Sequence, residues 1–194
     1  MHRRETFATT GPRMKLRFFG GFDFAETDIN GDFVAAGYER GVPMGGDLSS
    51  APDGTAPTFI VSALKDSQGA NLDRVQIIKT WVDGDGAAQE AIHDVVWSDN
   101  RQPDANGKLP AVGNTVDLAT ATYENTIGAT QLTGVFQDPD FDPAVKSVYY
   151  VRVLEIPTPR WTLYDKVHLG AEPDDNVPLV HQERGFSSPI WYTP

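Results

Sequence analysis

The sequence predicts an all-β fold, a β-sandwich of about seven to eight mainly antiparallel strands. Glycine and proline together account for 32 of the 194 residues, an excess that favours many turns joined by short strands. Segments of strand length, rich in β-branched and aromatic residues, recur between these turns. No segment with helical periodicity exceeds about ten residues. A chain of this length buries roughly 70% of its unfolded surface, enough for one sizeable domain.

Composition and charge exclude several classes of protein. Apolar residues make up 40% of the chain and charged residues 22%, which is typical of a globular protein. The sequence contains no cysteine, so disulfide frameworks, cysteine zinc sites and cysteine nucleophiles are excluded. A net charge of -11 argues against nucleic acid as a partner, because binding phosphates requires clustered basic residues. No apolar run is long enough to cross a membrane, and the first residues lack the apolar segment of a signal peptide.

The first seventeen residues carry five basic side chains, although the rest of the chain is strongly acidic. His2 to Ala8 is expected to form the last turns of a helix, which Gly11 and Pro12 end. A helix of about eight residues is not stable alone in water. We therefore interpret residues 1–12 as the remnant of a preceding helix and Met1 as a cut or an internal start. Such an arm either stays solvated or docks on an acidic surface, including a neighbouring copy.

Residues 13–194 form the predicted sandwich domain. Arg13 to Phe19 alternates apolar and basic side chains with the period of a half-buried strand. Gly20 to Ser50 is expected to be rich in loops, and the tail from about residue 157 to wrap the surface irregularly. The other main strands are predicted over Thr58–Leu64, Arg74–Val82, Ile92–Trp97, Gln131–Gln137 and Ser147–Ile156. The predicted core includes Ile77, Trp81, Val151 and Val153.

Metal-ligand patterns are weak in this sequence. The four histidines, His2, His93, His168 and His181, show no spacing typical of a metal site. Acidic turns offer oxygen ligands for calcium, with Asp83 and Asp85 in one turn and Asp138, Asp140 and Asp142 in another. None fits the EF-hand pattern, and the same residue types are common in ordinary hairpin turns. No nucleophile motif, phosphate-binding loop or catalytic residue is identified, and no cofactor is expected in this chain.

The C-terminal tail mixes aromatic side chains with charges of both signs. Its candidate ligand-binding residues are Arg160, Trp161, Tyr164, Asp165, Glu183, Arg184 and Trp191. Exposed tryptophan and tyrosine would suit a sugar ring or a protein interface. Alternatively, these aromatics close the open end of the sandwich, with Arg160 and Arg184 paired to Asp165 and Glu183. The sequence leaves both interpretations open.

Several of these stretches resemble a known family. They are RETFATTGPR at residues 4–13, RFFGG at 17–21, PTPRW at 157–161 with Tyr164 and Asp165, QER at 182–184, and SPIWY at 188–192. Together they resemble the C-terminal third of a bacterial family catalogued as domain of unknown function 3604. The resemblance spans essentially the whole chain.

The resemblance implies a role within a larger protein. Full members of the family are about three times this length, and their N-terminal part resembles metal-dependent hydrolases of the PHP (polymerase and histidinol phosphatase) type. Many members look exported. The metal-ligand motifs of that barrel have no counterpart here, so no catalytic residue carries over, and a divalent metal is expected only in the upstream barrel.

Three functions therefore compete. The first is a non-catalytic C-terminal domain that packs on the barrel and shapes access to it. The second is a ligand-binding module, for carbohydrate or another ligand, that uses the tail aromatics. The third, which the sequence disfavours, is a free-standing enzyme.

Overall fold

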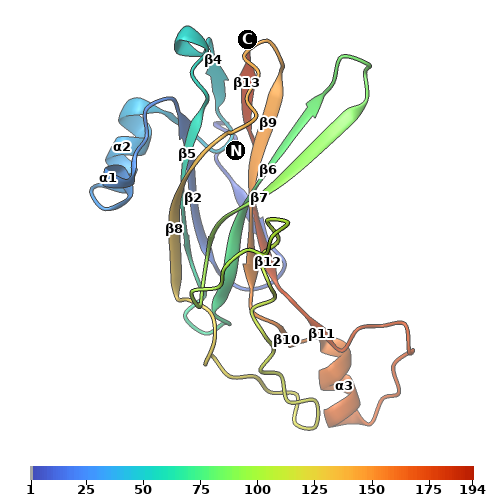
Figure 1. The fold of residues 1–194 in the computed structure, drawn as a ribbon. Helices are drawn as coiled ribbons and strands as arrows, with labels where there is room; N and C mark the ends of the chain where they lie inside the picture. Colours follow the sequence, from blue (N-terminus) through green and yellow to red (C-terminus); the bar gives the residue numbers. More distant parts are fainter. Residues whose placement is uncertain (1) are drawn as a thin grey trace.

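The computed structural model describes residues 2–194, and its fold is a β-sandwich with few helices, as predicted (Figure 1). Eight of the strands in this part of the chain are four or more residues long. The eight are β2 (Lys15–Gly21), β5 (Thr58–Leu64), β6 (Leu72–Val82), β7 (Ala88–Trp97), β8 (Gln131–Gln137), β9 (Ser147–Glu155), β12 (Arg184–Ser187) and β13 (Ile190–Thr193). The shorter strands are β1 (Phe7–Thr9), β3 (Val42–Pro43), β4 (Asp47–Ser49), β10 (Thr158–Pro159) and β11 (Val180–His181).

Two sheets face each other across the core. The first, which we call sheet B, has four antiparallel strands in the order β3-β2-β5-β8. The second, sheet A, has seven strands and is built on β9. One edge of β9 pairs with β6, which in turn pairs with β7. The other edge pairs with β12 along one half and β13 along the other, and these two carry β1 and β4.

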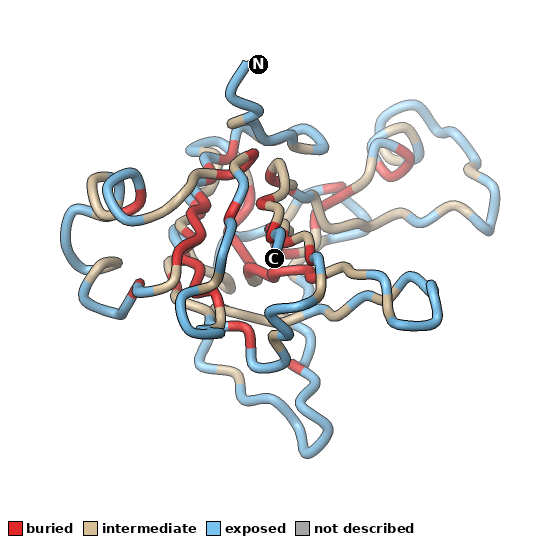
Figure 2. Tube along the Cα trace, turned by 90° about the horizontal axis from the view of Figure 1, so that it is seen from above, coloured by how far each residue is buried: buried red, intermediate tan, exposed pale blue. Residues whose placement is uncertain are grey.

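The core lies between the two sheets because both turn an apolar row inward. Phe18, Phe59 and Val61 of sheet B pack with Tyr149 and Val151 of sheet A. Figure 2 shows the buried positions along the strands and the exposed ones on the surrounding loops. Of the predicted core residues, Ile77, Val151 and Val153 are confirmed as buried. The prediction for Trp81 is wrong: it is only half-buried, because the β6–β7 hairpin projects beyond sheet B there (Figure 1).

Helices α1 (Glu26–Ile29) and α2 (Phe33–Arg40) cover the outer face of sheet B, within a region predicted as loop. The Asp32 side chain caps α2 by accepting a hydrogen bond from the Ala35 amide at 3.0 Å. Gly37 lets α2 approach closely, since a Cβ atom there would lie 2.5 Å from the Phe19 ring. Both helices are too short for periodicity to identify them in the sequence.

The predicted helical remnant at the N-terminus is wrong. Within His2 to Ala8 the structure has a turn followed by the start of β1, which pairs antiparallel with β12 at the edge of sheet A. The edge of β12 offers backbone hydrogen bonds that a single short helix could not match in stability. Residues 7–9 therefore belong to the sandwich. The interpretation of Met1 falls outside the described residues.

The tail from residue 157 is more regular than predicted. It contains the helix α3 (Trp161–Leu169) and the strands β12 and β13. β13 contributes Ile190 and Tyr192 to the core. The tail is thus an integral part of sheet A, with α3 projecting from one end (Figure 1).

A buried ion pair joins the two layers beneath the acidic turn at residues 138–142. Lys79 Nζ lies 2.7 Å from Asp138 Oδ2, and Tyr149 donates a hydrogen bond of 2.7 Å to the same oxygen. Both charged side chains are almost fully buried, and Lys79 also donates to the Asp140 carbonyl at 2.8 Å. Burial and the bond to Asp138 raise the pKa of Tyr149 above its usual value. Removing either charge would leave the other unpaired in the core.

Replacing Val151 by alanine tests the placement of the core. Val151 has no exposed surface, so the lost burial and the residual cavity should lower the free energy of unfolding by about 1–3 kcal/mol. Denaturant titration measures the change. Val82, with 59% of its surface exposed, is the matched control, and Val82→Ala should change stability by less than about 0.5 kcal/mol. Equal effects of the two substitutions would contradict the assigned core.

Candidate functional site

Five of the seven ligand-binding candidates meet in one cleft, which we call the α3 cleft. It is an open hollow of about 630 Å³ between α3 and the segment around β11 and β12. The predicted residues that line it are Arg160, Trp161, Tyr164, Glu183 and Arg184. Thr10, Pro159, His181 and Gln182, which the sequence interpretation did not select, complete the lining.

Local pairing of short elements holds α3 in place. β10 pairs with β11, and the Arg160 amide donates to the Leu179 carbonyl at 2.9 Å just before the helix begins. Thr162 donates from its hydroxyl to the Pro178 carbonyl at 2.9 Å and is buried. Gly170, with φ of +68°, ends the helix in the left-handed conformation that suits glycine. These contacts fix which face of α3 points outward.

The outward face of α3 carries an aromatic row. Trp161, Tyr164 and His168 recur at helical spacing, so they share one face. Trp161 is 60% exposed and Tyr164 is 40% exposed. The Tyr164 and His168 rings are stacked, with centroids 6.2 Å apart. The aromatics therefore do not close the end of the sandwich, and two of them form one wall of the α3 cleft.

The charges in the cleft are not paired as expected if the tail closed the end of the sandwich, which would pair Arg160 and Arg184 with Asp165 and Glu183. Glu183 Oε1 lies 3.0 Å from His181 Nε2, and the Thr10 hydroxyl donates to the other oxygen of Glu183. Within residues 2–194 the guanidinium groups of Arg160 and Arg184 form neither an ion pair nor a hydrogen bond with the protein. Arg160 Nη1 is shielded from solvent and lacks an acceptor, and its guanidinium lies 5.2 Å from the Trp161 ring centroid. The cleft thus holds two cationic groups without partners.

The other two ligand-binding candidates lie elsewhere. Asp165 faces a second hollow together with Glu172 and Asp174. Arg160 and Trp161 line this hollow as well as the α3 cleft. Trp191 belongs to β13, where the Arg4 guanidinium lies 4.7 Å from the centroid of its ring. The structure does not bring either residue into the α3 cleft.

The acidic turns use their carboxylates to close themselves. Asp83 accepts hydrogen bonds from the amides of Asp85 and Ala87 at 3.0 and 2.9 Å and from the Gln89 side chain at 2.6 Å. These bonds, that of Ala87 foremost, lower the pKa of Asp83. Asp142 accepts from the Ala144 amide at 2.9 Å, while Asp138 is bound by Lys79. A calcium ion in either turn would have to replace these bonds. Residues 2–194 contain no cluster of three or more acids or histidines placed to hold a metal.

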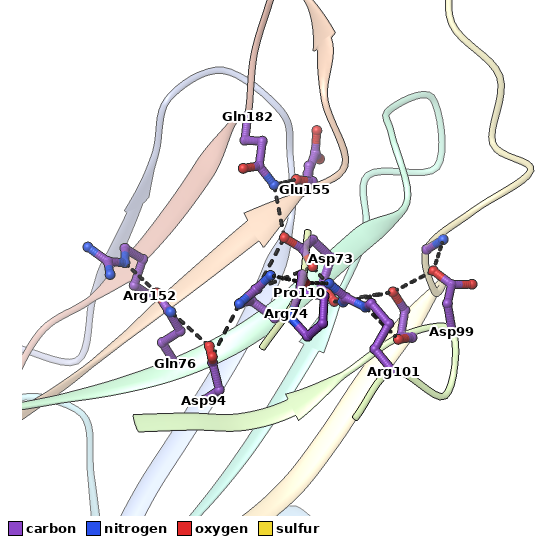
Figure 3. Close-up of polar contacts among 12 residues, drawn as sticks. Asp73, Arg74, Gln76, Asp94, Asp99, Arg101, Pro110, Arg152, Glu155 and Gln182 are labelled. Carbon is purple, nitrogen blue, oxygen red and sulfur yellow. Dashed lines mark hydrogen bonds and ion pairs between the residues drawn. The ribbon is translucent and has the colours of Figure 1, made fainter. Parts of the chain in front are cut away.

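A polar network behind the cleft was not predicted (Figure 3). Its centre is Asp73, which is only 2% exposed. The Asp73 carboxylate accepts from Arg101 Nη2 at 2.6 Å, from Gln182 Nε2 at 2.9 Å and from Arg74 Nε at 3.2 Å. Arg74 also reaches Asp94 at 3.2 Å. The network continues from Asp94 through Gln76 to Arg152 on the open face of sheet A.

Glu155 lies under the cleft and is the most perturbed carboxyl group described. Its backbone amide donates to the Glu183 carbonyl at 3.0 Å, and its side chain is almost fully buried, with Oε1 lacking a partner. Burial, with the nearby charges of Glu183 and Asp66, raises the pKa of Glu155 to about 8, while Lys65 opposes this rise. The burial of Glu155 could have been predicted from the sequence, because Glu155 continues the alternation of inward-facing residues Tyr149, Val151 and Val153.

The open face of sheet A carries a group of apolar side chains beside the polar row of Gln76, Asp94 and Arg152. The members of this group, which we call the outer apolar face, are Ile92, Val148, Tyr150, Phe186 and Trp191. Strand register places them on one side: Ile78 pairs with both Ile92 and Tyr150, Val148 pairs with Trp191, and Arg152 pairs with Phe186. Ile92 is 48% exposed and the others are half-buried. A hollow of about 850 Å³ between the β6–β7 hairpin and residues 144–146 adjoins this face.

Comparison with known protein families matches the whole chain, residues 1–194, to one family. The chain belongs to the family described as "Protein of unknown function (DUF3604)". The resemblance to this family, inferred from the sequence motifs, is thus confirmed. No curated protein and no solved structure matches it. None of the helices in residues 2–194 is long and apolar enough to cross a membrane.

Replacing Glu155 by glutamine should change how stability depends on pH. The folded pKa of about 8 lies above the ordinary value, so the folded state holds a proton that the unfolded state releases. Stability therefore falls as pH rises from about 4.5 to 8. The glutamine variant should lack this decline and exceed the wild type at pH 9 by roughly 2–4 kcal/mol. Denaturant titrations at pH 5, 7 and 9 measure the free energy of unfolding of both proteins. If this free energy changes with pH by the same amount in the wild type and the variant, Glu155 is not protonated at neutral pH.

Proposed function

We propose that this chain is a non-catalytic β domain of a larger protein that resembles PHP-type metal-dependent hydrolases. In this proposal the domain packs on the catalytic barrel through the outer apolar face and shapes access to it. The barrel supplies the chemistry and holds any divalent metal. No residue of this chain has a catalytic role.

The outer apolar face is the observation that carries the proposal. In an antiparallel sheet with one solvated face, polar side chains normally alternate with the buried ones. The outward residues of β9 are Val148, Tyr150, Arg152 and Leu154, of which three are apolar. Helices α1 and α2 cover the corresponding face of sheet B, whereas no helix within residues 2–194 covers the outer apolar face (Figure 1). A group of partly exposed apolar side chains of this kind is typical of an interface.

The path of the N-terminal segment also favours docking through the outer apolar face. Arg4 stacks over Trp191, a member of the outer apolar face, and pairs with Asp47 at 2.5 Å. The chain then enters β1, the strand next to Phe186 in β12. A domain joined ahead of residue 4 would therefore start beside the outer apolar face, and a short connection would hold it there.

Hydrogen exchange of β7 tests the docking proposal. β7 pairs only with β6 in the described sheet, so one edge of its backbone is unpaired. Its outward-pointing amides should exchange at least 10-fold more slowly in the polypeptide that carries the upstream barrel than in this chain alone. Ile92→Glu should remove that protection, because it places a charge in the interface.

The matched control for this test is Val34→Glu, on the opposite side of the molecule. Val34 lies on α2 and is 40% exposed, so this variant should keep the protection of β7. Equal exchange of β7 in the lone chain and in the longer polypeptide would refute docking through this face.

The α3 cleft favours a second candidate function, a carbohydrate- or other ligand-binding module. Trp161 and Tyr164 present exposed rings to an open cleft of about 630 Å³. Aromatic faces beside a few convergent polar groups are typical of ligand sites. The cleft lies at the end of the molecule occupied by α3, away from the end where β13 and β4 lie (Figure 1). The two functions therefore use different surfaces.

A further inference from the structure

Two arginines without a carboxylate partner lie in the α3 cleft. Acidic residues outnumber lysines and arginines by 27 to 16, so carboxylates are abundant. Six other arginines pair with them: Arg3, Arg4, Arg17, Arg40, Arg74 and Arg101. Within residues 2–194 the guanidinium groups of Arg13, Arg152, Arg160 and Arg184 have no such partner, and of these Arg160 and Arg184 line one cleft.

The carboxylates beside these groups are not paired with them. Glu183 is held by His181 and by the Thr10 hydroxyl. Asp165 lines the second hollow, which Arg160 also borders, but within residues 2–194 no hydrogen bond or ion pair joins the two side chains. Arg160 is further restrained against the Trp161 ring, with its Nη1 atom cut off from water. A guanidinium that has lost water without gaining an acceptor is costly. The lining of the cleft itself includes two arginines and one carboxylate, Glu183. An anionic ligand would supply the acceptor that the arginines lack.

The shape and lining of the cleft restrict the anion. A guanidinium offers a planar fork that matches the two oxygens of a carboxylate. Beside it, the exposed faces of Trp161 and Tyr164 suit a flat apolar surface such as one side of a pyranose ring. A lone inorganic anion would leave both aromatic rings unused, and a neutral sugar would leave both arginines unpaired.

We infer that the α3 cleft binds an acidic saccharide, with a uronate carboxylate on Arg160 and Arg184 and the sugar ring against Trp161 and Tyr164. This inference rests on the second candidate function and specifies its ligand class. It is independent of docking through the outer apolar face.

Calorimetric titration with uronate trisaccharides tests the inference. The probes are the galacturonate, glucuronate, mannuronate and guluronate trimers, each beside its methyl ester, which keeps the ring and removes the charge. At least one acid trimer should bind, and its ester should bind at least 10-fold more weakly. Binding of the acid should weaken as salt is raised, because screening reduces the attraction between charges.

Substitutions then assign the contacts. Arg160→Gln and Arg184→Gln should each weaken binding of the acid trimer at least 10-fold, and Trp161→Ala should weaken both acid and ester. Arg13→Gln is the control, since it removes the same charge from a different hollow and should leave binding unchanged. Unfolding curves for each variant show whether it retains the fold.

The failures are distinguishable. Equal binding of an acid trimer and its ester would contradict the inference that the ligand is acidic, but it would still support a ligand-binding function. Inorganic phosphate that binds as tightly as any trimer, with the same dependence on Arg160, would overturn the saccharide. Binding of none of the trimers would overturn the inference and the carbohydrate form of the second candidate function together.

Discussion

The buried carboxylate of Asp73 is the interaction on which the arrangement of the chain depends. Asp73 sits at an irregularity of β6, where Leu72 pairs with Glu155 but Arg74 already pairs with Leu154. Such a bulge redirects a side chain from the regular alternation. The buried charge would be costly without partners, and it receives hydrogen bonds from Arg74, Arg101 and Gln182. One carboxylate thus joins sheet A, the long loop after β7 and the tail.

Those three partners organise the surfaces that concern function. Gln182 bridges Asp73 and the Glu155 carbonyl, at 2.9 and 2.8 Å. It therefore fixes the segment from β11 to the start of β12, whose residues His181, Glu183 and Arg184 line the α3 cleft. Arg101 anchors the loop that follows β7 by also donating to the Pro110 carbonyl at 2.8 Å. The loop is thereby held at the Arg74 end of sheet A, while the outer apolar face stays uncovered. The two proposed binding surfaces lie on either side of this network.

The sequence predicts the strands well, because alternation is a local signal: the pattern over residues 147–156 locates β9 and its buried row. It fails for the N-terminal segment, where pairing with β12 depends on residues 176 to 180 positions away. It also fails for Trp81, whose exposure depends on where sheet B ends. The candidate cleft was predicted in part, since Arg160, Trp161, Tyr164, Glu183 and Arg184 drew attention as charged and aromatic residues. That both arginines lack partners was not predictable, nor was the Asp73 network, whose members lie 28 and 109 residues apart. Such contacts are determined by the tertiary fold.

Hydrogen exchange of an Asp73→Ala variant tests the organising role of Asp73 most directly. If the network joins these parts, residues 98–113 and 181–184 should lose protection together, while β2, β5 and β8 of sheet B keep theirs. The same variant should lose much of the order around the α3 cleft without global unfolding. Unchanged exchange at 181–184, with a loss confined to the loop after β7, would contradict the account, because it would show that the cleft is held independently of Asp73.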